Sequence, residues 1–186
     1  SQLNELVWKL DGPELRAFNA TRLNQHCRDN LLMRQFLGRG VFTPTLQTAM
    51  LDHLDALRPA QGCDAMLELG MSARTELEAR YLVNALRLVA DHLGQRAQGG
   101  TLLVAGAGLA YDSVDGERVL PLPVDHLTWT SEVAEYIDRS EFRLSAKTLL
   151  ISGQSTMRSQ RELTSRGWNL VIVAGRDHAS QEDLAR

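Results

Sequence analysis

The sequence predicts an α/β domain in which a small, mainly parallel sheet is flanked by helices. Three short apolar runs of strand length carry this prediction: residues 101–105, 148–151 and 170–173. The second and third runs are separated by a polar segment in which Ser155 or Thr156 can cap a helix and Gly167 can end it. Two buried strands joined by one helix form a right-handed crossover between parallel strands.

The first 62 residues show the spacing of amphipathic helices, so we expect a helical extension or layer over residues 1–62. Its clearest helix has Thr43 as N-cap and Pro44 in the first position. The apolar stripe of that helix consists of Leu46, Met50, Leu54 and Leu57. We expect residues 63–175 to form the α/β core and residues 176–186 a polar tail.

The longest helix is expected to run from Ser72 to about Gln98. Residues 66–70, just before it, fit either a short strand or the end of a helix. Its apolar arc is broad, which predicts burial against the sheet on one side and the N-terminal helices on the other. That arc contains Leu77, Tyr81, Asn84, Leu88 and Leu93, widened by Leu82, Val83, Ala85, Leu86 and Val89.

Residues 109–122 are typical of a β-hairpin, because Asp115-Gly116 is a favoured tight-turn pair. Pro121 and Pro123 follow, and proline cannot donate to a sheet ladder, so this segment is expected to leave the sheet or lie on its edge. A further helix is expected to begin at Thr130 or Ser131.

Composition excludes several classes of function. The 186 residues carry a formal net charge of −3, which argues against a general nucleic-acid binder and against a polybasic membrane binder. No apolar run approaches the length of a transmembrane helix, and no signal-peptide pattern follows Ser1. Cys27 and Cys63 are compatible with a disulfide in an oxidising compartment and equally with two buried thiols.

Two glycine-containing turns are candidate ligand sites. Gly106-Ala107-Gly108 follows a predicted strand, but the dinucleotide pattern needs a third glycine where Tyr111 stands. Residues 152–156 precede a helix whose N–H groups attract anions, and Arg158 and Arg161 add positive charge. If the strands are neighbours, one edge of the sheet collects the predicted ligand-binding residues: Gly106, Gly108, Gly153, Gln154, Ser155, Thr156 and Arg158.

The sequence matches no catalytic or metal-binding template. Asp125, His126 and Ser155 have the right chemistry for acid–base and nucleophilic groups, but no G-x-S-x-G elbow surrounds the serine. The histidines lack metal-ligand spacing, and the acidic residues of 112–117 do not match a calcium loop. We therefore predict no catalytic residue, no cofactor and no metal site.

Two segments carry a family resemblance. Residues 119–130, and residues 151–155 together with 161–168, resemble segments of exported bacterial proteins of uncharacterised activity. The resemblance implies a cell-envelope or secreted location, so a periplasmic or secreted protein is favoured over a cytoplasmic one. It implies no activity and assigns no residue a role.

These observations favour a non-enzymatic binding or interaction module with a protein or small-molecule partner, and they are compatible with a homo-oligomer. The alternative is an enzyme that acts on a phosphorylated or acyl small molecule at the C-terminal edge of the sheet. Ser155, Asp125 and His126 would be its candidate catalytic groups.

Overall fold

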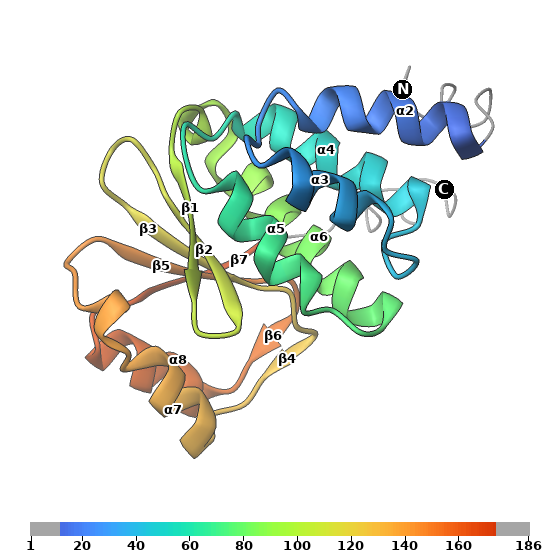
Figure 1. Cartoon of the computed structure of the whole chain (residues 1–186). Coiled ribbons are helices and arrows are strands. Elements are labelled where there is room, and N and C mark those ends of the chain that lie inside the picture. The colour runs from blue at the N-terminus through green and yellow to red at the C-terminus, as the bar shows by residue number, and fades with distance from the viewer. Residues whose placement is uncertain (1–11, 174–186) are drawn as a thin grey trace, which may run out of the picture.

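The computed structural model describes residues 12–173, in which helices cover both faces of a five-stranded sheet (Figure 1). The expected polar tail, residues 176–186, lies outside the described residues. The helices of the N-terminal half are α2 (Gly12–Leu23), α3 (Asn30–Leu37), α4 (Pro44–Leu57), α5 (Cys63–Met71) and α6 (Glu76–Leu93). The sheet contains β1 (Thr101–Ala105), β2 (Gly108–Asp112), β3 (Arg118–Leu122), β5 (Lys147–Ile151) and β7 (Asn169–Ile172).

Most of the helix starts that the sequence predicts from capping residues are confirmed. Thr43 caps α4 by accepting the N–H of Leu46, and Pro44 is its first residue. The longest helix, however, does not begin at Ser72. Residues 66–70 belong to α5, and α6 begins after Thr75, which forms a reciprocal capping box with Glu78.

The prediction of a mainly parallel sheet is wrong, because the sheet is mixed. Its order is β1-β2-β3-β5-β7, with antiparallel pairs β1–β2 and β2–β3 and parallel pairs β3–β5 and β5–β7. The predicted parallel crossover through α8 (Met157–Ser165) is confirmed. The strand at 101–105 differs because the chain turns back directly at Gly106-Ala107 and pairs with β2.

Pro121 also departs from its prediction, since it lies in β3, the central strand of the sheet. Arg118 donates its N–H to the carbonyl oxygen of Ala146, the residue before β5, and the backbone N–H groups of successive residues in a strand point to opposite neighbouring strands. The nitrogen of Pro121 therefore faces β2, and the β2–β3 register has already ended at Tyr111 and Val119. Pro121 occupies a central strand without breaking a ladder hydrogen bond.

The remaining elements form a smaller layer. The connector β4 (His126–Leu127) pairs in parallel with β6 (Gln154–Ser155), separately from the main sheet. Helix α7 (Ser131–Ile137) is capped by Thr130, and α8 is capped by Thr156. Single turns of 3-10 helix follow α6 (Gly94–Ala97) and α7 (Ser140–Phe142). In Figure 1, α7 and α8 lie on the side of the sheet opposite helices α2–α6.

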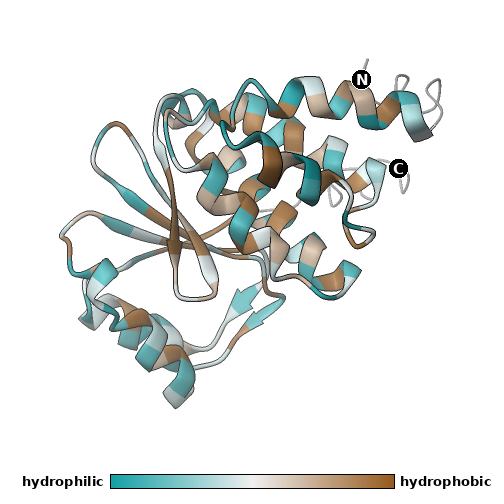
Figure 2. Cartoon of the chain, in the orientation of Figure 1, coloured by the Kyte–Doolittle hydropathy of each residue, from teal (hydrophilic) through white to brown (hydrophobic). Residues whose placement is uncertain are grey.

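Alternate residues of each strand build two hydrophobic cores, one on each face of the sheet. Leu102, Tyr111, Val119 and Leu150 pack with the N-terminal helices, whereas Leu120, Leu149 and Ile151 pack with Trp129, Phe142 and Trp168. Figure 2 shows hydrophobic residues in the middle of the sheet and, along the helices, hydrophobic residues interspersed with hydrophilic ones. Helix α6 contacts both α4 and β3, as its broad apolar arc predicts.

A disulfide joins Cys27 to Cys63, so of the two alternatives that the sequence leaves open the structure contains the paired form. Both residues are buried. The bond connects the loop between α2 and α3 to the first residue of α5. Beside it, the Asp64 carboxylate accepts the backbone N–H groups of Arg28 and Asp29. This junction holds the outer helices against the helix that reaches the sheet.

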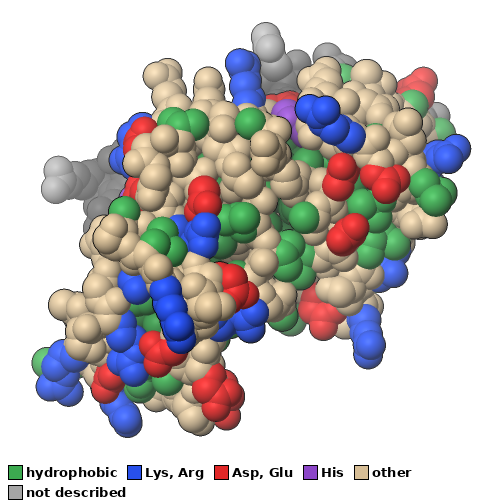
Figure 3. Space-filling view, turned by 60° about the vertical axis from the view of Figure 1, so that its left-hand side comes forward, with side chains coloured by type: hydrophobic (Ala, Val, Ile, Leu, Met, Phe, Trp, Pro, Cys, Tyr) green, Lys and Arg blue, Asp and Glu red, His purple; other side chains and the backbone are tan. Residues whose placement is uncertain are grey.

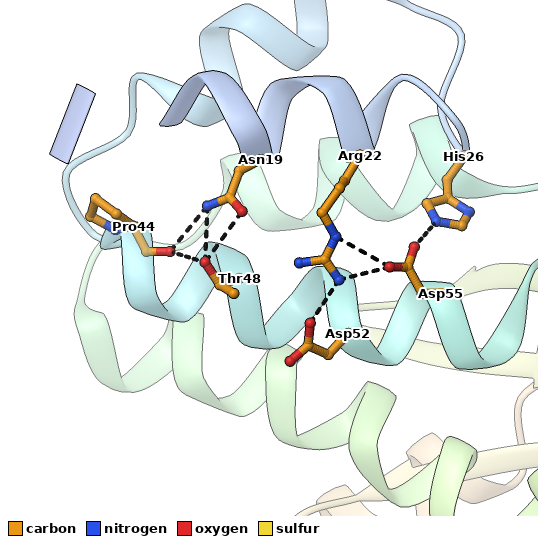
Figure 4. A network of polar contacts seen from close by, with 7 residues as sticks. All are labelled: Asn19, Arg22, His26, Pro44, Thr48, Asp52 and Asp55. Carbon is orange, nitrogen blue, oxygen red and sulfur yellow. Dashed lines mark hydrogen bonds and ion pairs between the residues drawn. The ribbon is translucent and has the colours of Figure 1, made fainter. Parts of the chain in front are cut away.

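A polar network joins α2 to α4 (Figure 4). The Arg22 side chain is only 9% exposed and donates to Asp52 Oδ1 and Asp55 Oδ2, both at 2.7 Å. His26 Nε2 lies 2.6 Å from Asp55 Oδ1. Further along the same two helices, buried Asn19 exchanges hydrogen bonds with Thr48. Arg22 therefore depends on two carboxylates for compensation of its buried charge.

Replacing Asp55 by alanine is expected to destabilise the protein by about 2–4 kcal/mol, because it leaves the Arg22 charge buried with Asp52 alone. The double variant Arg22→Met/Asp55→Ala should be more stable than Asp55→Ala, since methionine keeps the apolar stem and removes the charge. Urea unfolding measures both values. Glu76→Ala, which opens the exposed Arg80–Glu76 pair, is the control and should cost at most about 0.5 kcal/mol. Equal stability of the single and double variants would contradict the prediction.

Candidate functional site

A cavity of about 620 Å³ lies between the helical half and the C-terminal edge of the sheet. The end of α5 and the first half of α6 form one wall, and the β1–β2 turn and residues 123–124 form the other. Strands β1 and β3 both run toward this edge, because each is antiparallel to β2. Ligands of α/β proteins usually bind at such an edge.

The cavity is predominantly apolar. Leu82, Ala85 and Leu109 are buried wall residues, and Pro123 and Val124 are half-buried. Figure 3 shows hydrophobic side chains at the surface in the middle of the face that it presents, with acidic and basic side chains around them. An apolar hollow open to solvent is an unfavourable surface unless something occupies it.

Two exposed side chains of α6 extend this wall toward solvent. Leu77 is 78% exposed and Tyr81 is 38% exposed, although the apolar arc of this helix predicts that both are buried. They lie four residues apart and therefore on the same face of the helix. Exposed Asn84 continues that face by one further turn. The first half of α6 thus lines the cavity.

Tyr136 of α7 supports the β1–β2 turn from the other face of the sheet, where it packs with the second core, and does not itself line the cavity. Its hydroxyl donates to the carbonyl oxygen of Ala105 at 3.0 Å and lies against Gly108. A Cβ on Gly108 would stand 2.2 Å from Tyr136 Oη, so the turn needs glycine here to admit the phenol. Burial raises the pKa of Tyr136 to about 12, and the neighbouring Tyr81 phenol contributes to the rise. Burial also raises the pKa of Tyr81. Both phenols are therefore protonated and uncharged at neutral pH.

The charged side chains at the rim already have partners. The Glu78 carboxylate accepts the backbone N–H groups of Arg74 and Thr75 in the capping box of α6. Arg80 donates to Glu76 Oε1 through both Nε and Nη2, at 2.9 and 2.6 Å. The rim therefore offers a ligand little unpaired charge.

The predicted ligand-binding residues all lie near the C-terminal edge, but they do not form one site. Gly108 lines the cavity, and Gly106, with φ +60°, packs against Arg139. Strands β2 and β3 separate this turn from the segment that follows β5. In that second segment, Gly153 is in such close contact with Asp125 that a Cβ would stand 1.9 Å from its carbonyl oxygen.

The other residues of that segment have structural contacts. Gln154 and Ser155 form β6, and the Ser155 hydroxyl accepts a hydrogen bond from Gln160 at 3.0 Å. The Thr156 hydroxyl accepts the N–H of Ser159, and Arg158 is exposed on α8. None of these four side chains lines the 620 Å³ cavity.

The candidate catalytic side chains do not form a triad. Asp125 and His126 are exposed, and His126 pairs through its backbone with Gln154. Within residues 12–173 no hydrogen bond joins the side chains of Asp125, His126 and Ser155. In the same range no group of three histidine, cysteine or acidic side chains could hold a metal ion, and no helix has the length and apolarity needed to cross a membrane.

A second hollow, polar and about 490 Å³ in volume, lies beside the Arg22 network. Its walls include His26 and Asp55, which are paired with each other, and Arg58, which ends α4 in the left-handed conformation with φ 43°. Because Asp55 also accepts from Arg22, its carboxylate is already compensated. The contacts here account for how α2 is held to α4.

The sequence does not mark Leu77 and Tyr81 as residues of a site. Their only signal is an apolar arc on α6 wider than one packing partner requires, and such an arc predicts burial. No protein-family model, curated protein or solved structure matches this chain.

Proposed function

We propose that this protein is a non-enzymatic binding module that takes a small, mainly apolar molecule into the 620 Å³ cavity. The cavity itself carries the proposal, because ligand sites of proteins are concave, mostly apolar and about 300–1,000 Å³ in volume. Its position at the C-terminal edge of the sheet supports the same interpretation.

The walls of the cavity belong to rigid elements, which favours a site that exists before the ligand arrives. Helix α6 begins with a complete capping box at Thr75 and Glu78. The β1–β2 turn is held by Tyr136 through its hydrogen bond to Ala105. A ligand that enters such a site does not have to order its walls, so less binding free energy is lost.

Binding is favoured over catalysis because of the groups that the cavity presents. Its polar side chains are Tyr81, Asn84 and Ser72, together with the engaged Glu78 and Arg80. A general base or nucleophile is normally activated by a partner within hydrogen-bond reach. Among the described residues no such pair of side chains lines this cavity.

We also propose that the protein works in an oxidising compartment such as the bacterial periplasm or the extracellular medium. The buried Cys27–Cys63 disulfide supports this location, since such bonds persist mainly outside reducing cytosol. The resemblance of residues 119–130, and of residues 151–155 with 161–168, to exported bacterial proteins implies the same location.

The binding proposal is tested by titrating the protein with N-phenyl-1-naphthylamine, an uncharged dye that fluoresces in apolar sites. We expect saturable binding that Leu77→Asp weakens about tenfold, because an exposed rim leucine contributes part of the value of a buried one. Leu31→Asp is the matched control, since Leu31 is 58% exposed on α3 and lies away from the cavity. Absence of saturation, or equal weakening by the two substitutions, would overturn the proposal.

A further inference from the structure

We infer that the edge strand β7 pairs antiparallel with the β7 strand of a second copy of this chain, so that the two sheets join into one across a two-fold axis. This interface is separate from the cavity, because no residue of β7 lines it. The inference is therefore independent of the proposed function.

The backbone groups on the outer side of β7 have no partner. In the parallel pair with β5, Val173 donates its N–H to the carbonyl oxygen of Ile151, so Val171 also faces β5. The N–H and C=O groups of Leu170 and Ile172, the alternate residues, point away from the sheet. In the part of the chain that the structure describes, no strand lies beyond β7 to receive them. Such an edge is a template for a further strand.

The two edges of the sheet differ in their protection. At the opposite edge, Leu102 of β1 donates its N–H to the carbonyl oxygen of Gln61, which lies just before α5. At β7, by contrast, none of residues 167–173 is charged and none is a proline. Edge strands of monomeric proteins usually carry a charged side chain or a proline that opposes pairing, so this edge is unprotected.

Charge and register both favour a second copy as the partner. A second copy brings the same side chains, so identical strands pair without repulsion only if they carry no like charges, and β7 meets this condition. A two-fold axis at Val171 places Leu170 of each strand opposite Ile172 of the other, and these are the residues whose N–H and C=O groups point outward. Each Ile172, which is 56% exposed, then packs beside a leucine. Pairing satisfies the backbone groups and covers the exposed apolar side chain together.

The dimer is expected to be weak, because the strand has only four residues. Such a pairing buries less than the roughly 1,200 Å² of a standard interface, which corresponds to dissociation in the micromolar range. Sedimentation equilibrium of the native protein measures this property. We expect the apparent mass to rise from 20.7 kDa toward twice that value between about 1 µM and about 500 µM protein.

Ile172→Lys should weaken the dimer at least about tenfold, because the charged side chain of each copy would have to lie beside Leu170 of the other. Val104→Lys is the matched control, since Val104 is 40% exposed on β1 at the opposite edge. It should leave the dissociation constant unchanged. Equal weakening by the two substitutions would overturn the inference.

Ile172→Pro tests the main chain directly. It removes an outward N–H that has no partner within one copy, so the urea midpoint of the monomer should stay close to that of the native protein while the dimer is lost. A variant that folds normally and still dimerises would contradict the proposed register. A native protein that remains at 20.7 kDa at every concentration would overturn the inference and leave this edge to a strand of a different protein.

Discussion

Gly62→Ala is expected to lower the free energy of unfolding by about 2–5 kcal/mol, because it combines a strained backbone with an overlap between two main chains. Gly62 precedes α5 with φ +90°, and a Cβ there would stand 1.9 Å from the carbonyl oxygen of Leu102 in β1. Leu102 cannot easily withdraw, since its N–H donates to the carbonyl of Gln61 at 3.0 Å.

Substitutions at two other glycines separate the cost of the strained backbone from the cost of the overlap. Gly116, at the tip of the β2–β3 hairpin, has φ +85°, but a Cβ added there would have no neighbouring atom within 4 Å. Gly116→Ala should therefore show the conformational cost alone, about 1–2 kcal/mol. Gly40 has neither a positive φ nor a close neighbour, and Gly40→Ala should change stability by at most about 0.5 kcal/mol. Urea unfolding of the three variants orders these costs. If Gly62→Ala is no less stable than Gly116→Ala, α5 does not dock on β1 as described.

Opening the Cys27–Cys63 disulfide is expected to cost about 3–4 kcal/mol, since the bond closes a loop with a sequence separation of 36. Most of this effect is in the unfolded state, because opening a long loop increases the conformational entropy of the unfolded chain. Reductant should therefore shift the urea midpoint of the native protein to a clearly lower value.

The control for this prediction is Cys27→Ala/Cys63→Ala, whose midpoint should not respond to reductant. Its stability should lie near or below that of the reduced protein, because alanine also leaves small cavities at two buried positions. A native protein whose midpoint is the same with and without reductant would contradict the predicted stabilisation. The result bears on location as well, since a protein that depends on this bond is poorly suited to a reducing compartment.

The effects of Gly62→Ala and of opening the disulfide both arise where the start of α5 meets β1 and the loop before α3. Gly62 allows the start of α5 to touch β1, and Cys63, the next residue, ties that helix to the loop before α3. The sheet and the N-terminal helices share one hydrophobic core, which contains Leu23, Leu67 and Leu86 on the helical side and Tyr111 and Leu150 on the sheet. Loosening the junction would therefore disturb the wall of the cavity that α5 and α6 provide.

The sequence by itself determined the features that depend on neighbouring residues. The start of α4 at Thr43-Pro44, the Asp115-Gly116 hairpin and the parallel crossover of β5, α8 and β7 all follow from caps, turn residues and apolar runs within a few positions of one another. The start of α6 is also set locally, because the capping box of Thr75 and Glu78 begins the helix three residues after the predicted cap at Ser72.

Only the tertiary structure decided the direction of β1 and β2, the place of Pro121, the pairing of the cysteines and the cavity. Pro121 lies in the central strand because of the direction in which its nitrogen faces and the point at which β2 ends, and neither is visible in the composition of the segment. The cavity is space that remains where α6, the β1–β2 turn and residues 123–124 meet, and Tyr136, 31 residues beyond Ala105, supports that turn from the other face of the sheet. A local pattern specifies how a segment folds, but it does not specify which distant surfaces come together or what space they leave between them.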